Sequence, residues 1–163
     1  MSVDLDIDPV RPTPLRPLLP RIAAVLSEML GGATLPALVL ERLEQGERLA
    51  VADDRIGTDD SAFLLLSLAG EPETIGIQSA VDRLSVTVYG ARSNVQYALG
   101  AATAIVLAQS LGSVITDDRQ FFSDHLQTSP EALLDRLRVA ERHQDHRQAA
   151  ERIDWGPGGQ PWR

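Results

Sequence analysis

The chain has 163 residues, of which 44% are hydrophobic and only 4% aromatic, so it can build one core mainly from aliphatic side chains. It has no cysteine and all 15 basic residues are arginine, which excludes thiol nucleophiles, disulfides, cysteine-bound zinc, Schiff-base lysines and the P-loop lysine. The net charge of −8 opposes nucleic-acid binding and favours a basic protein partner.

The start of the chain, MSVDLDIDPV, is acidic and lacks the basic and apolar regions of a secretory signal. No apolar run approaches the roughly 20 residues that a membrane-spanning helix needs. We therefore expect a cytoplasmic protein that makes no membrane contact.

Residues 1–17 contain four prolines and are expected to form an extended arm. Residues 18–152 are expected to form a single domain, which begins with a helix from Pro20 to Leu30. Gly31 and Gly32 end this helix. Its apolar residues recur at helical spacing: Ile22, Val25, Leu26 and Met29.

A period of two residues then replaces the helical period, which predicts strands. The first two strands are expected to pair as a hairpin across Gln45 and Gly46. The third is almost wholly apolar, as a strand covered on both faces would be. The last two look like antiparallel neighbours. The predicted strands are Ala37–Leu43, Glu47–Ala52, Ala62–Ala69, Glu73–Ala80 and Arg83–Tyr89.

The segment Ser93–Leu111 predicts a buried helix, because it is apolar on most sides and rich in alanine. Ser93 and Gln96 have the spacing of a capping box, and Gly112 ends the helix. A short strand is expected at Ser113–Thr116. Strand, helix and strand in succession predict a right-handed crossover and at least one parallel pair.

A last helix is predicted from Pro130 to Arg152, with Ser129 as its N-cap. Residues 153–163 form an expected irregular tail rich in glycine and proline. It holds the only tryptophans, Trp155 and Trp162, which we expect to pack back onto the domain. The predicted fold is α+β, with a mixed, mainly antiparallel sheet of five or six strands and helices packed on it.

Three Asp-Asp pairs are the most unusual feature of the sequence: Asp53-Asp54, Asp59-Asp60 and Asp117-Asp118. They lack the alternating order of a calcium loop, and neighbouring side chains on an extended chain diverge. An acid–base pair would need two carboxylates that converge in a pocket. Two interpretations stay open, which are solvated turn residues and an acidic recognition surface.

Two other groups of residues have weaker patterns. His143 and His146 lie three positions apart in the last predicted helix, but no third metal ligand is identifiable, so we expect a solvated helix face. The turn from Gly90 to Ser93 resembles an anion-binding turn at a helix start, with Arg92 and Ser93 as candidate ligands. No metal or cofactor is expected.

The segment Val86–Asp118, VTVYGARSNVQYALGAATAIVLAQSLGSVITDD, joins an aliphatic strand, an alanine-rich helix and a short strand that ends in acids. This arrangement resembles the small cytoplasmic immunity proteins of bacterial toxin systems. The resemblance implies an acidic, single-domain, non-catalytic protein that binds and blocks one cognate toxin. It assigns no functional role to any single residue.

The sequence therefore favours a non-enzymatic binding protein with an acidic surface that fills the basic active site of a toxin. A first alternative is a ligand-binding or enzymatic domain that uses the Gly90–Ser93 turn and the pair Asp117-Asp118. A second alternative is an accessory or adaptor subunit of a bacterial assembly. The oligomeric state stays open. The predicted partner-binding residues are Asp53, Asp54, Asp59, Asp60, Asp117 and Asp118.

Overall fold

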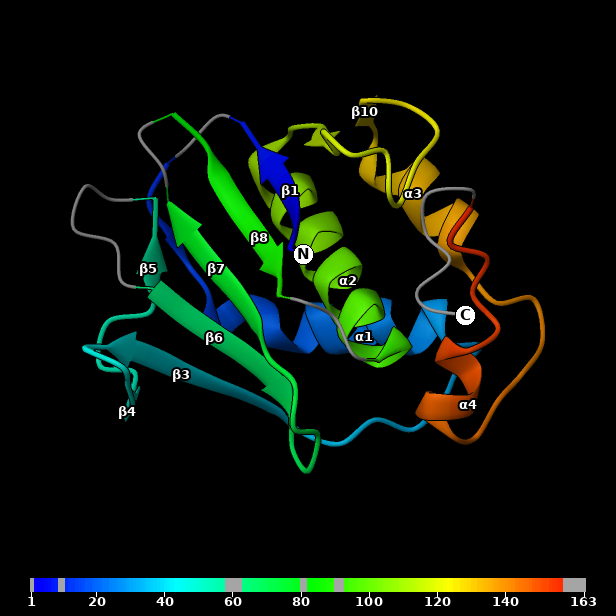
Figure 1. Ribbon diagram of the computed structural model, residues 1–163, viewed down its shortest axis with the longest axis horizontal. Helices are drawn as coiled ribbons and strands as arrows, with labels where there is room; N and C mark the ends of the chain where they lie inside the picture. Colours follow the sequence, from blue (N-terminus) through cyan, green and yellow to red (C-terminus); the bar gives the residue numbers. More distant parts are fainter. Residues whose placement is uncertain (1, 9–10, 58–62, 80–81, 90–92, 157–163) are drawn as a thin grey trace.

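The computed structural model describes residues 2–8, 11–57, 63–79, 82–89 and 93–156, which form one large sheet with helices packed beside it (Figure 1). The order of strands in the large sheet is β10-β9-β1-β8-β7-β6-β3-β4, and every pair of neighbours is antiparallel. Its strands are β1 (Val3–Ile7), β3 (Leu38–Glu44), β4 (Glu47–Ala50), β6 (Phe63–Leu68), β7 (Ile75–Ser79), β8 (Leu84–Val88), β9 (Ile115–Thr116) and β10 (Gln127–Thr128).

The α+β class and the mainly antiparallel sheet are confirmed, but the described part of the chain has eight strands in this sheet where five or six were predicted. Two more short strands, β2 (Thr13–Pro14) and β5 (Arg55–Ile56), pair beside it. The hairpin of β3 and β4 turns at Gln45 and Gly46 as predicted, and both turn residues have positive φ angles of 51° and 85°. The pairing of β7 with β8 is also confirmed.

The expected extended arm at residues 1–17 is wrong for Val3–Ile7, because these residues form β1 in the interior of the sheet. β1 pairs with β8 on one side and with β9 on the other. The segment VDLDI alternates apolar and acidic residues, so it buries one face and leaves the other polar.

The predicted parallel pair is also wrong. β8 and β9 are both antiparallel to β1, so they run in the same direction but β1 separates them. The chain therefore crosses from β8 through α2 (Asn94–Leu111) to β9 and leaves a gap of one strand, which the N-terminal segment fills. A sequence pattern that reports only neighbours along the chain does not reveal such an insertion.

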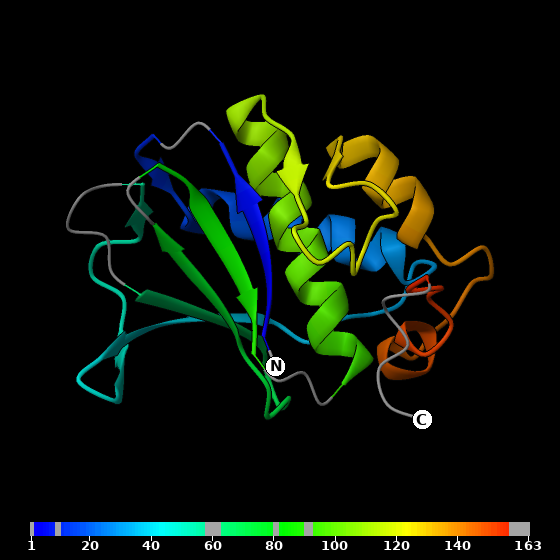
Figure 2. The same cartoon turned by 45° about the horizontal axis from the view of Figure 1, so that its top comes forward.

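The helix α2 lies at the centre of the molecule, between the sheet and the other helices (Figures 1 and 2). The side chain of Ser93 accepts a hydrogen bond from the backbone N–H of Gln96, and Gly112 ends the helix in the left-handed conformation, both as predicted. Gly100 lies directly against Val88 of β8, where a Cβ atom would have no room. Small residues thus let α2 approach the sheet closely.

The remaining helices cover the side of α2 that faces away from the sheet. They are η1 (Arg16–Leu18), α1 (Leu19–Met29), α3 (Pro130–Leu137) and α4 (His146–Ala150). In Figure 1, α1 passes behind the strands and no helix lies in front of them. No described helix covers the opposite face of the sheet, which we call the open face, although Leu65 and Ser67 of β6 on that face are only 5% and 7% exposed. No helix in the described ranges is long and apolar enough to cross a membrane.

The single helix predicted over Pro130–Arg152 is wrong, because it divides into α3 and α4. Beyond Leu137 the sequence has no continuous apolar stripe to bury, and Arg138 takes an extended conformation. The segment then runs beside the end of α1, where the backbone N–H of Val139 donates to the carbonyl of Met29. Backbone pairing with α1 replaces the helical hydrogen bonds there.

The described part of the tail folds back onto the domain. Trp155 is 5% exposed, and its ring lies 5.7 Å from the rings of both Tyr97 and Phe122. The expectation that this tryptophan packs on the core is confirmed. Trp162 lies outside the described residues.

Candidate functional site: an acidic cavity on the open face of the sheet

The pair Asp53-Asp54 lies in the loop between β4 and β5. Arg55 donates hydrogen bonds to both carboxylate oxygens of Asp53, at 2.8 to 3.3 Å. The hydrogen bonds from the Arg55 side chain, then that from its backbone N–H, hold the pKa of Asp53 at about 2, below its ordinary 3.8. Asp54 accepts a hydrogen bond from the backbone N–H of Arg16 at 2.6 Å. Both carboxylates therefore also have local structural partners. Asp59 and Asp60 lie outside the described residues.

Asp117 is not part of an acidic surface, which corrects the prediction for this residue. Its side chain is fully buried, and its Oδ2 atom accepts hydrogen bonds from the backbone N–H groups of Phe122 at 2.6 Å and Ser123 at 3.3 Å. It thereby holds together the loop that follows β9. The neighbouring Asp118 is exposed, so the two carboxylates of this pair do not converge on a shared site.

Asp118 instead joins two carboxylates that the sequence reading did not select. It lines a cavity of about 250 Å³ together with Asp4 and Asp6 of β1. The other lining residues are Arg83, Ser85 and Arg119. The cavity thus collects three carboxylates and two guanidinium groups on the open face, from segments far apart in the sequence.

Hydrogen bonds between side chains fix the two carboxylates of β1. Asp6 is 6% exposed and accepts hydrogen bonds from Arg83, at 2.9 Å, and from the Ser85 hydroxyl. Asp4 is exposed and accepts one from the Thr87 hydroxyl at 2.7 Å. Thr87 and Ser85 lie on β8 directly opposite Asp4 and Asp6, whereas Arg83 reaches Asp6 from the position just before β8. The alternation of VDLDI was the sequence signal that could have located both aspartates on one face.

An aromatic pair continues the open face beyond the acidic cavity. The rings of Tyr89 and Phe63 lie 6.0 Å apart, and both sit over Gly76, where they leave no room for a Cβ atom. Tyr89 is 40% exposed. The pKa of Tyr89 is raised, mainly because its hydroxyl is partly buried. A hydrogen bond with Thr87 lowers this pKa, and the negative charge of Asp4 raises it further. An exposed aromatic ring therefore lies within electrostatic reach of an exposed carboxylate.

The predicted anion-binding turn is only partly described. The Ser93 hydroxyl accepts from Gln96 N at 3.2 Å and so serves as the helix cap. Arg92 and Gly90 lie outside the described residues, and the anion site stays a prediction.

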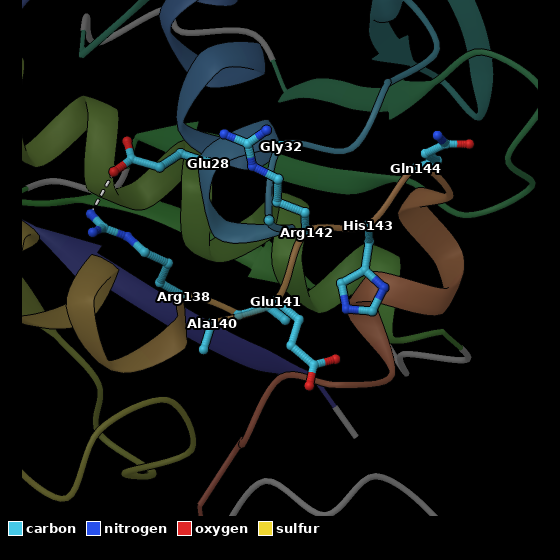
Figure 3. Close-up of a pocket in the computed structure, with 10 residues that line it drawn as sticks. Glu28, Gly32, Arg138, Ala140, Glu141, Arg142, His143 and Gln144 are labelled. Atoms are coloured by element: carbon cyan, nitrogen blue, oxygen red, sulfur yellow. Dashed lines mark hydrogen bonds and ion pairs between the residues drawn. The ribbon is translucent and has the colours of Figure 1, made fainter.

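A larger hollow of about 640 Å³ lies where the segment 138–144 passes the end of α1 (Figure 3). The ion pair of Arg138 with Glu28, at 2.5 Å, closes one side of it. The side chains of Glu141, Arg142 and His143 point in different directions (Figure 3). These groups do not converge on a common point, so this hollow offers no arrangement for acid–base or metal chemistry.

The two histidines of the last predicted helix do not share a helix face. His143 lies in the loop, whereas His146 begins α4 and its Nε2 atom lies 2.9 Å from Oε1 of Glu71. Arg147 donates to the same Oε1 atom at 2.8 Å. Within the described ranges, no three histidine, aspartate or glutamate side chains form a group that could hold a metal ion.

The contact of Glu71 with α4 predicts a loss of stability in acid. Burial alone would raise the pKa of Glu71, but the hydrogen bonds from Arg147 and His146 outweigh it and hold this pKa below the ordinary 4.5. A carboxylate with a lowered pKa stabilises the fold above its unfolded-state pKa and loses that contribution as the pH falls through its folded-state pKa. The stability advantage of the native chain over Glu71→Gln should therefore shrink below about pH 4.5.

Urea unfolding of both chains between neutral and acid pH measures this effect, with Glu73→Gln as a control for the lost charge. A stability difference between native chain and Glu71→Gln that stays constant with pH would contradict the assignment.

Comparison of the chain with protein-family models, with curated proteins and with solved structures found no match.

Proposed function

We propose that this chain is a non-catalytic binding protein that holds one basic protein partner on the acidic open face of its sheet. The observation that carries the proposal is the cavity lined by Asp4, Asp6 and Asp118, with the exposed ring of Tyr89 farther along the same face. Carboxylates attract lysine and arginine side chains, and an exposed tyrosine adds apolar area and a ring face for a cation. The net charge of −8 steers a basic partner toward the protein as a whole.

The partner class that we propose is a bacterial toxin with a basic active site. This part of the proposal rests on the resemblance of Val86–Asp118 to immunity proteins of toxin systems. The segment contains the second half of β8, all of α2 and β9, and it ends at Asp118 in the acidic cavity. Neutralisation would follow from occlusion, because the open face would cover the cleft that the toxin needs for its anionic substrate.

The test begins with affinity capture from the source cells and identification of the captured protein, followed by binding kinetics with that protein in purified form. The double variant Asp4→Asn with Asp118→Asn should associate about tenfold more slowly at low salt, because charged side chains mainly set the association rate. The difference should shrink at high salt.

A matched control removes two exposed acids from the helix side, Asp135→Asn with Glu151→Gln. It changes the net charge equally and should retain most of the native association rate. If both double variants associate equally slowly, the slower association reflects only the change in net charge. That result would refute the open face as the binding site. Turnover of a substrate by the purified chain would refute the non-catalytic proposal itself.

A further inference from the structure

The strand β4 forms one edge of the large sheet, and no described strand lies on its outer side. All four of its residues, Glu47 to Ala50, are exposed. An edge strand of this kind presents unpaired backbone N–H and C=O groups that can pair with a further strand.

The turn geometry shows which backbone groups these are. Positive φ angles at both Gln45 and Gly46 make a two-residue hairpin in which Glu44 and Glu47 exchange the closing hydrogen bonds. Because hydrogen-bonded and non-hydrogen-bonded pairs alternate along an antiparallel ladder, the N–H and C=O groups of Arg48 and Ala50 point away from β3. Two donors and two acceptors therefore face outward.

Several devices that block edge strands are missing from β4. It contains no proline, and its register with β3 runs without a bulge from Glu44–Glu47 to Glu41–Ala50. The guanidinium group of Arg48 turns back across the sheet to Glu41, at 3.3 Å. Leu49 is 42% exposed and offers apolar contact area at this edge.

The charge around this edge is negative in excess. Three nearby arginines pair with a carboxylate: Arg42 with Glu44 at 3.5 Å, Arg48 with Glu41 at 3.3 Å, and Arg55 with Asp53 at 2.8 Å. The guanidinium group of Arg16 instead donates to the backbone carbonyl of Val51, the residue directly after β4. No described arginine side chain forms an ion pair with Glu47, whereas the carboxylate of Asp54 accepts the backbone N–H of Arg16.

We propose that the edge of β4 accepts an extended, basic segment of the partner protein as an added antiparallel strand. Main-chain hydrogen bonds to Arg48 and Ala50 would hold the segment, and a lysine or arginine side chain of the segment would meet Glu47. The basic character of the segment rests on the proposed function, whereas the outward hydrogen-bonding groups rest on the geometry of β4 alone.

The probe is a fluorescent synthetic peptide of about six residues in which arginine and valine alternate. Fluorescence anisotropy measures its binding to the full chain, and amide shifts in a two-dimensional NMR spectrum locate it. The expected result is binding with shifts concentrated at residues 47–50. A control peptide of the same sequence with methylated backbone nitrogens keeps its charge but loses its backbone hydrogen-bond donors. Its affinity should be lower by a factor of about ten or more.

The matched variants are Arg48→Pro and Arg48→Gln, since both remove the ion pair with Glu41. Only proline removes the outward N–H, and an edge position tolerates it because that N–H has no partner on β3. Arg48→Pro should weaken peptide binding about tenfold, and Arg48→Gln should not. Circular dichroism verifies that both variants are folded, and the methylated peptide tests the same hydrogen bonds on the unchanged chain.

Equal binding of the methylated peptide, or no binding of the parent peptide, would overturn the proposal. If the chain instead forms a concentration-dependent dimer that Arg48→Pro abolishes, the edge of β4 pairs with a second copy of the chain. That result would also overturn the proposal. The double variant Asp4→Asn with Asp118→Asn separates the two proposals, because it should bind the peptide normally even though it associates slowly with the whole partner.

Discussion

Replacement of Asp117 by alanine should lower the free energy of unfolding by about 4 kcal/mol. The carboxylate is fully buried and accepts the backbone N–H groups of Phe122 and Ser123 through one oxygen. Alanine would leave both N–H groups buried without an acceptor, and each unsatisfied donor costs about 1 to 3 kcal/mol. Since a domain of this size is stable by only about 5 to 15 kcal/mol, the loss is a large part of the total.

The neighbouring residue provides the control for this prediction. Asp118→Ala removes the same charge from an exposed position, and it should change the stability by no more than about 0.5 kcal/mol. Asp117→Asn keeps an acceptor oxygen, so its free energy of unfolding should lie between those of the two alanine variants. Urea unfolding followed by circular dichroism measures all three, and equal stability of the Asp117→Ala and Asp118→Ala chains would show that Asp117 does not hold the loop.

Replacement of Gly31 by alanine should lower the free energy of unfolding by about 3 kcal/mol. Gly31 has a φ angle of +65°, which alanine adopts only with strain. An added Cβ would also collide with the backbone carbonyl of Glu141, so the segment 138–144 would have to move away from the end of α1. That movement breaks the backbone hydrogen bonds of Val139 to Met29 and of His143 to Gly31.

Gly32 separates the two causes of this loss. Its φ angle is +81°, but no atom lies within 4 Å of a Cβ added there. Gly32→Ala therefore introduces only backbone strain, and it should lower the free energy of unfolding by about 1 kcal/mol. Hydrogen exchange of the Val139 and His143 amides should accelerate strongly in Gly31→Ala alone. Similar stability and exchange in the two variants would show that the contact with Glu141 contributes nothing.

Local patterns in the sequence predicted most of the individual elements. The hairpin at Gln45-Gly46, the apolar strand β6, the pairing of β7 with β8, and the caps Ser93 and Ser129 are all confirmed. Each of these features depends on residues within one or two neighbouring segments. Turn chemistry, capping and alternation therefore suffice to define them.

The predictions that failed involve contacts between segments that are distant in the sequence. The prolines that follow β1 suggested an arm, but the place of Val3–Ile7 depends on β8 and β9, which come much later in the chain. The acidic cavity was missed for the same reason, because Asp4 and Asp6 were assigned to that arm. Asp117 was taken as exposed because a doublet alone does not say which member faces inward. Its alternation with the buried Ile115 gave a signal for burial.

The interior position of β1 also has a consequence for the order of events during folding. Asp6 and Ser85, which lie opposite each other, are 79 residues apart, and Ile7 pairs with Ile115 on its other side. During synthesis β1 must therefore wait for its first neighbour until β8, which ends at Val88, has emerged, and for its second neighbour until β9 at Ile115–Thr116 has emerged. Closure of such distant pairs is slow, so we expect the β3–β4 and β7–β8 ladders to form first and the insertion of β1 to be the late step that completes the acidic cavity.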